Sequence, residues 1–275
     1  MINGPISSED YREPRCLLDC GPGREIQSIP QRRIQEKLDE YMEKRDFRGA
    51  ERHLLYWQEE ARQGRDLQGQ LLVCNELIGF YRKTGCRDKA FSSCDEARHL
   101  LDVLAFRDNL SAGTTYVNMA TAYSAFEDDE QALDLFDKAK AIYESLTNTR
   151  PELLGGLYNN MGLTCAALGR FAEAHSLFDL AMKQMGNVPG GELEQAITCL
   201  NRADALNAEL EEEPVSEDIV KLLVQAKDLI FAADVPRDGY FAFVCEKCAP
   251  GFRYYGDEDT AGRLERLAEE IYAGA

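Results

Sequence analysis

The sequence of 275 residues has little proline and no long hydrophobic run. Its nine prolines fall mostly outside the stretches with helical periodicity, so long helices are compatible with it. No apolar run approaches the ~18 residues that a membrane-spanning helix needs. Residues 1–5 have neither the basic region nor the apolar core of a secretory signal. We therefore expect a cytoplasmic protein.

Positive charge is also scarce. The chain has 31 Lys and Arg against 49 Asp and Glu, which gives a formal net charge of −18. This excess of acidic residues argues against nucleic acid and against an anionic membrane as partners. The nine cysteines are odd in number and scattered along the chain, so we expect reduced thiols and no disulfide framework.

Recognisable enzyme motifs are missing as well. The sequence contains no glycine-rich phosphate loop, no G-x-S-x-G nucleophile elbow and no H-E-x-x-H metal motif. The carboxylate-rich stretch at residues 209–218 lacks the residue order of a calcium-binding loop. We predict that the protein is not an enzyme and holds no cofactor.

What the sequence does have is a pattern that recurs at an interval of 42 residues, as from Tyr116 to Tyr158 and from Ala132 to Ala174. Bulky and small residues alternate at helical spacing in both halves of each copy. In chain order these residues are Tyr116, Met119, Ala120, Tyr123, Ala132, Phe136 and Ala139, then Tyr158, Met161, Gly162, Cys165, Ala174, Phe178 and Ala181. Each half places them on one helical face. Two helices alone cannot bury such faces, so the units must stack.

This pattern resembles the tetratricopeptide repeat, with its aromatic, Leu-Gly, Tyr, Ala, Phe and Ala signature. That repeat has roughly 34 residues, and the longer interval here adds about two helical turns per unit. Long units of this kind are similar to those of kinesin light chains, in which an Asn-Asn also precedes the Leu-Ala pair, as Asn159-Asn160 precedes Met161-Gly162 here. The resemblance implies an all-α, right-handed solenoid of about six helix pairs.

The interval also predicts how the chain is divided. The expected units cover residues 29–62, 71–105, 113–146, 155–186, 193–233 and 240–273 of one solenoid over residues 29–275. Residues 1–28, broken by Gly and Pro, are expected to form an irregular arm. A shift of register predicts a three-residue insertion in the acidic loop near Pro214. Residues Asn148 to Pro151 are expected to separate the third and fourth units and to stop the earlier helix, and Pro250 is expected to kink the first helix of the last unit.

In tetratricopeptide solenoids the first helices line a concave groove, and the resemblance therefore implies which residues face it. Asn75, Asn159 and Asn201 occupy the same groove position in different units, and Asn118 and Asn160 lie one place along. An Asn amide can pair with both C=O and N–H of a peptide backbone. The alternative is that these side chains bond neighbouring helices or face water. Arg82 and Arg202 are candidates for binding a carboxylate or phosphate, although exposed Arg is usually solvated.

The remaining groove positions are mostly small, which leaves room for an extended chain. They are Leu72, Gly79, Lys83, Thr114, Val117, Thr121, Ser124, Ala125, Gly156, Leu163, Ala166, Ala167, Thr198, Ala205, Ala208 and Glu209.

Cys245 and Cys248 have the spacing of half a zinc or redox site. The other close pair, Cys16 and Cys20, belongs to the opposite end of the chain, and both Cys245 and Cys248 fall on core positions. We expect buried thiols and no metal site.

Three functional hypotheses follow. The first is a non-enzymatic scaffold that binds a partner protein or an extended peptide segment in the groove. The second is a receptor for a small signalling peptide that acts on another protein. The third is a Cys-based metal or redox protein, which the scattered cysteines favour least.

Overall fold

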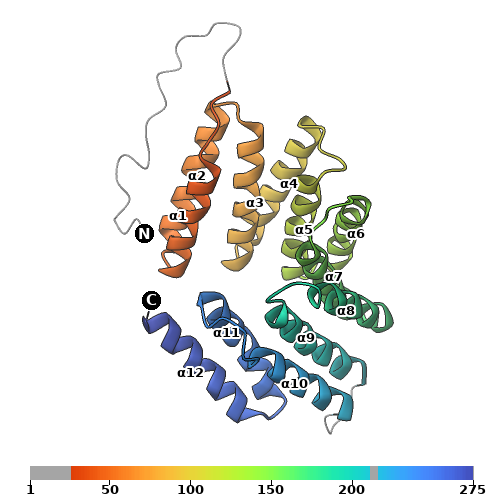
Figure 1. Ribbon diagram of the computed structural model, residues 1–275. Coiled ribbons are helices and arrows are strands. Elements are labelled where there is room, and N and C mark those ends of the chain that lie inside the picture. Colours follow the sequence, from red (N-terminus) through yellow and green to blue (C-terminus); the bar gives the residue numbers. More distant parts are fainter. Residues whose placement is uncertain (1–25, 211–215, 275) are drawn as a thin grey trace, which may run out of the picture. The chain divides into compact units, whose positions relative to one another are not determined.

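The computed structural model describes residues 26–210 and 216–274, and within them the chain forms helices joined by short connections, without strands. Twelve helices follow one another in six pairs over these residues (Figure 1). The predicted all-α solenoid class is therefore confirmed. The predicted arm lies outside the described residues except for residues 26–28, and the loop with the predicted insertion is outside them at residues 211–215. No helix of the described part is long and apolar enough to cross a membrane.

Contacts within the chain divide it into two compact units, and the first ends at Ala105. In this unit each helix packs against the next. Its helices are α1 (Gln31–Glu43), α2 (Phe47–Gln63), α3 (Leu67–Lys83) and α4 (Arg87–Val103). Its core is built from fully buried side chains that include Ile34, Leu54, Leu77 and Cys94.

The second unit runs from Phe106 to Ala275 and contains four helix pairs. The first helices of the pairs also touch one another: α5 contacts α7, α7 contacts α9, and α9 contacts α11. The helices are α5 (Leu110–Ala125), α6 (Asp129–Ser145), α7 (Pro151–Ala167), α8 (Phe171–Met185), α9 (Glu192–Leu210), α10 (Glu217–Ile230), α11 (Gly239–Tyr254) and α12 (Glu258–Gly274).

The small residues of the repeat pattern lie where the paired helices pack together. Ala120, Ala132 and Ala174 are fully buried. A Cβ atom built on Gly162 of α7 would lie 2.6 Å from Cε1 of Phe178 on α8, which is inside van der Waals contact. The ring of Phe178 therefore occupies the space that any side chain at position 162 would need.

The segment predicted to separate two units, residues 148–151, lies between helices: α6 ends at Ser145 and α7 begins at Pro151. Pro151 is the first residue of α7, where its missing N–H costs no helical hydrogen bond. Pro250 does lie inside a helix, and α11 continues through it to Tyr254.

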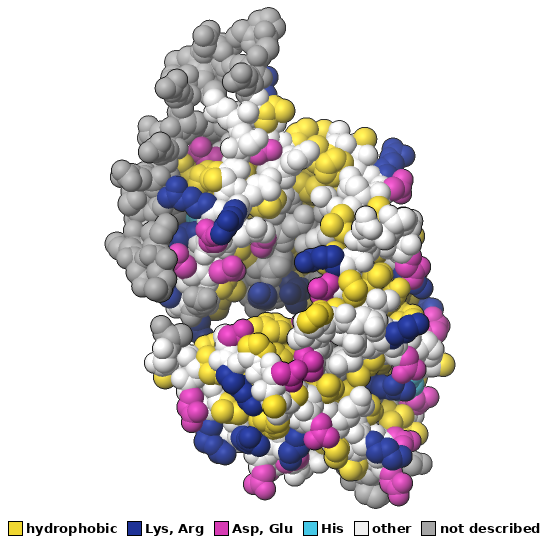
Figure 2. All heavy atoms as spheres, viewed as in Figure 1, with side chains coloured by type: hydrophobic (Ala, Val, Ile, Leu, Met, Phe, Trp, Pro, Cys, Tyr) yellow, Lys and Arg dark blue, Asp and Glu magenta, His cyan; other side chains and the backbone are white. Residues whose placement is uncertain are grey.

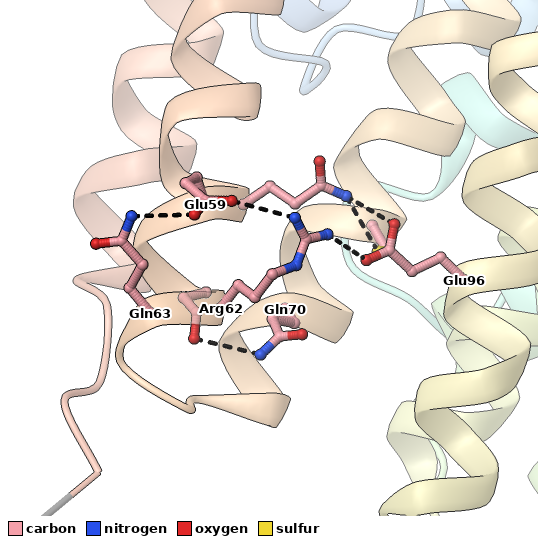
Figure 3. Close-up of polar contacts among 8 residues, drawn as sticks. Glu59, Arg62, Gln63, Gln70 and Glu96 are labelled. Atoms are coloured by element: carbon pink, nitrogen blue, oxygen red, sulfur yellow. Dashed lines mark hydrogen bonds and ion pairs between the residues drawn. The ribbon is translucent and has the colours of Figure 1, made fainter. Parts of the chain in front are cut away.

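A polar network joins α2 to α4 within the first unit (Figure 3). Arg62 Nη2 donates to Glu96 Oε1 at 3.1 Å, and Gln58 Nε2 donates to Glu96 Oε2 at 2.9 Å. Arg62 Nη1 also donates to Glu59 Oε2 at 3.1 Å. Exposed ion pairs contribute little stability, so we infer that this network mainly fixes the position of α2 relative to α4.

Asp66 holds the entry of α3 and the start of the described chain together. Asp66 is 5% exposed, and its carboxylate accepts from the backbone N–H of Gly69 at 2.9 Å and of Ile29 at 3.0 Å. Asp46 caps α2 in the same way but accepts one bond, from Gly49 N–H at 2.9 Å.

Replacing Asp66 by Ala should lower the free energy of unfolding by about 2 kcal/mol, because it removes a helix cap and leaves the buried N–H of Ile29 without an acceptor. The matched variant Asp46→Ala should cost about 1 kcal/mol, the usual value of a cap alone. Urea unfolding followed by far-UV circular dichroism measures both. Equal losses for the two variants would show that the Ile29 bond contributes nothing.

Candidate peptide-binding face

In the second unit, α5, α7, α9 and α11 lie side by side and form what we call the first-helix face (Figure 1). Most of the side chains predicted to line the groove here are half-buried or exposed, and Gly156, Leu163 and Ala167 of α7 are exposed. Two predicted positions of α9 are nearly covered, since Thr198 and Ala205 are only 2% and 3% exposed, although Thr198 still lines a cavity on this face. They are covered because α9 packs against both α7 and α11.

Asn159 and Asn201 meet on this face. Asn201 Nδ2 donates to Asn159 Oδ1 at 2.9 Å, and both side chains are half-buried. The predicted alternative, in which these side chains bond neighbouring helices, therefore holds for the oxygen of Asn159 and the nitrogen of Asn201. Within the described residues, Asn159 Nδ2 and Asn201 Oδ1 have no hydrogen-bond partner. The pair thus offers one free donor on α7 and one free acceptor on α9.

The other asparagines that were predicted to face the groove have different surroundings. Asn75 lies in the first unit and donates to Leu71 O of its own helix at 3.0 Å. Asn118 is half-buried on α5. Asn160 is half-buried on α7 and lies beside Asn159 in a common cavity. The structure therefore brings Asn159, Asn160 and Asn201 together, and these three form the candidate site.

The cavity next to the Asn pair, which we call the α7–α9 hollow, has a volume of about 300 Å³. Helices α7, α9 and α11, the last residue of α8 and the α8–α9 connection supply its walls. Its lining residues are Glu152, Gly155, Gly156, Asn159, Asn160, Met185, Val188, Gly190, Glu194, Ile197, Thr198 and Lys247. Gly156 leaves part of the wall open, because a Cβ atom there would meet nothing within 4 Å.

Three charged residues of the hollow were missed by the sequence analysis. Glu152 precedes the groove position Gly156 by one helical turn, and that spacing could have revealed it. Lys247 lies on α11, a helix for which the sequence analysis named no groove positions. Glu194 accepts a hydrogen bond from the Tyr240 hydroxyl. Partial burial, and next this bond to Glu194, raise the pKa of Tyr240 above its usual value, so the hydroxyl remains a donor.

The arginines of the prediction do not join this site. Arg202 Nη1 donates to Asp179 Oδ1 of α8 at 2.5 Å, and Arg202 lines a separate hollow of about 380 Å³ with His175 and Glu209. Its neighbour Asn201 faces α7 instead, because successive residues of a helix point about 100° apart. Arg82 lies in the first unit, half-buried on α3, where burial lowers the pKa of its guanidinium.

Cys245 and Cys248 are buried, as their core positions predicted. Burial raises the pKa of the Cys245 thiol to about 11 and that of Cys248 to about 12, so both stay protonated near neutral pH. Cys16 and Cys20 lie outside the described residues. In the described part of the chain, no three His, Cys, Asp or Glu side chains are grouped as metal ligands would be.

The surface in view over α9 to α12 mixes acidic, basic and hydrophobic side chains (Figure 2). Among the exposed large hydrophobic residues of α11 are Tyr240 and Phe243, whose rings stack at a centroid distance of 6.1 Å. The acidic excess of the sequence is therefore not gathered into a single patch on this view.

Comparisons with known proteins bear on the class of fold. Residues 69–145 match the sequence model of the tetratricopeptide repeat family. Protein KINESIN LIGHT CHAIN-RELATED 2 of Arabidopsis thaliana is 22% identical over 193 residues, which make up 70% of this chain and 27% of that protein. The chain thus spans about a quarter of the length of this relative.

Two solved structures are similar in fold. BtubC (BKLC) from P. vanneervenii superposes with a TM-score of 0.59 at 19% identity, over 72% of this chain and 78% of that one. The second is a crystal structure of nearly identical TPR-like repeats of a kinesin light chain from Podosopora anserina. It superposes with a TM-score of 0.58 at 18% identity, over 74% of this chain and 97% of that one.

The resemblance seen in the sequence is confirmed by these matches. Residues 69–145 therefore match the tetratricopeptide repeat, and the chain is similar in fold to solved structures with repeats of this kind. Its long repeats are similar in fold to those of kinesin light chains. Repeats of this class stack into extended binding surfaces and generally mediate protein–protein interaction.

Proposed function

We propose that this protein is a non-enzymatic, cytoplasmic scaffold that binds an extended peptide segment of a partner protein along the first-helix face. The observation that carries the proposal is the Asn159–Asn201 pair, which keeps one donor and one acceptor free. An extended peptide presents the complementary groups, a C=O and an N–H, along its backbone. The small exposed residues of α7, Gly156 and Ala167, leave room for that backbone to approach.

A protein segment suits this face better than nucleic acid or an anionic membrane does. Both of those carry dense negative charge, whereas the chain has a net charge of −18 and the hollow beside the Asn pair contains Glu152 and Glu194. Backbone recognition by the Asn pair would be tolerant of sequence, so neighbouring side-chain pockets would supply the specificity.

The double variant Asn159→Ala/Asn201→Ala tests the proposal. Individual 12-residue peptides recovered from a phage-displayed random library on the full chain serve as probes, and fluorescence polarisation measures their binding. We expect at least a tenfold weaker Kd, because two backbone hydrogen bonds of about 1 kcal/mol each are lost. The free energy of unfolding should change little, since both partners of the Asn–Asn bond are removed together.

Asn148→Ala, in the α6–α7 connection and not among the residues that line the hollow, is the matched control and should bind as the parent protein does. Loss of stability in parallel with loss of binding would make the pair a structural bond only. A library selection that recovers no peptide, or peptides whose Kd is indifferent to the double variant, would contradict the proposed function.

A further inference from the structure

The α7–α9 hollow opens beside the Asn pair and carries more negative than positive charge. Its lining contains two carboxylates, Glu152 and Glu194, against the single ammonium group of Lys247. None of the described residues forms an ion pair with Glu152 or with Lys247, so these charges are not neutralised internally. We propose that this hollow is a specificity pocket for one basic side chain, Lys or Arg, of the bound peptide. The inference rests on the proposed function above.

The size of the hollow fits a single long side chain. Its volume of about 300 Å³ is at the lower end of ligand pockets, which is enough for an Arg or Lys side chain but not for a helix of a partner. The aliphatic stem of such a side chain would lie against Met185, Val188 and Ile197, the apolar part of the wall.

The acceptors of the hollow are arranged for a cationic group. Glu194 is fixed by the hydroxyl of Tyr240, which donates to Oε1 and leaves Oε2 free. The Glu152 carboxylate is exposed at the N-terminal end of α7, and Asn160 adds an amide oxygen from the same helix. A guanidinium group has five N–H donors, and an ammonium group has three, so either can engage two or more of these acceptors.

An acidic side chain is the poorer occupant. It would gain from Lys247 but would lie near two carboxylates in a half-enclosed space, where like charges repel more strongly than in water. Lys247 is better placed to contact a carbonyl or carboxylate of the peptide next to the basic residue. The hollow should therefore select a basic residue at one fixed position of each bound peptide.

The peptides recovered on the full chain provide the test. We expect Lys or Arg at a constant position, and replacement of an Arg there by citrulline, which has the same shape without the charge, should weaken binding at least tenfold. In the variant Glu152→Gln/Glu194→Gln the same replacement should change binding less than twofold. Gln keeps an acceptor for Tyr240, so this variant preserves the wall. Glu269→Gln/Glu270→Gln, two exposed residues of α12, is the control and should behave as the parent protein.

Each outcome separates this inference from the proposed function. Peptides that depend on Asn159 and Asn201 but show no basic residue at a fixed position would overturn the pocket and leave the scaffold function standing. The same holds if citrulline weakens binding equally in the parent protein and in the Gln variant, or if acidic residues are selected through Lys247. Peptides whose binding ignores the Asn pair would overturn both proposals.

Discussion

Replacing Phe178 by Ala lowers the free energy of unfolding by about 3–5 kcal/mol, the range for removing a fully buried phenyl ring. Phe178 has no exposed surface, and its ring packs across the α7–α8 interface against the backbone of Gly162. The surrounding helices cannot close over the cavity, because fully buried neighbours such as Ala174 and Ala181 hold α8 against α7. Urea unfolding of the full chain, followed by circular dichroism, measures the loss.

Leu180 supplies the matched control on the same helix. Its side chain is 38% exposed, so Leu180→Ala removes much less buried surface than Phe178→Ala and should cost less than about 1.5 kcal/mol. A loss of similar size for both variants would mean that the α7–α8 interface is not tightly packed around the ring.

The second large effect is expected at Gly162. Gly162→Leu should lower the free energy of unfolding by at least about 3 kcal/mol, because even its Cβ atom would come within 2.6 Å of a Phe178 ring that is enclosed on all sides. Either α7 and α8 must separate or the ring must leave its place, and both expose core surface.

Gly156 is the control for this second prediction because it belongs to the same helix and meets nothing within 4 Å of an added Cβ atom. Gly156→Leu should raise stability by about 0.5–1 kcal/mol, the gain in helix propensity over Gly. The two substitutions are chemically identical, and they should move the urea midpoint in opposite directions. If Gly162→Leu also stabilises the chain, the proposed close approach of α7 and α8 is wrong.

The fold was predictable because the residues that pack between its helices recur in the sequence at a regular spacing. The interval of 42 residues placed Met119, Met161 and Phe178 in the core, and all three are buried. Small residues at Ala120 and Gly162 can be explained only by a helix that approaches closely, so they identify both the partner helix and its spacing. Neighbouring helices limit which side chains fit at such core positions, so the periodic pattern of one sequence is enough to recognise them.

The site was less predictable because exposure depends on what a neighbouring helix covers. Asn160 and Arg202 hold the same place in successive repeats, yet Asn160 lines the α7–α9 hollow while Arg202 pairs with Asp179. The sequence sets the angle at which a side chain leaves its helix, but not the charge that it will meet there. Ala205 was assigned to the open groove and proved buried for the same reason.

The bond between Asn201 and Asn159 also has a consequence for polarity. With Asn159 Oδ1 occupied, α7 offers the N–H group and α9 offers the oxygen. In an extended chain the N–H of a residue comes before its C=O, and both point to the same side. A guest that gives the N–H and the C=O of one and the same residue to Asn201 and Asn159 would therefore run from α9 toward α7, opposite to the order of the repeats.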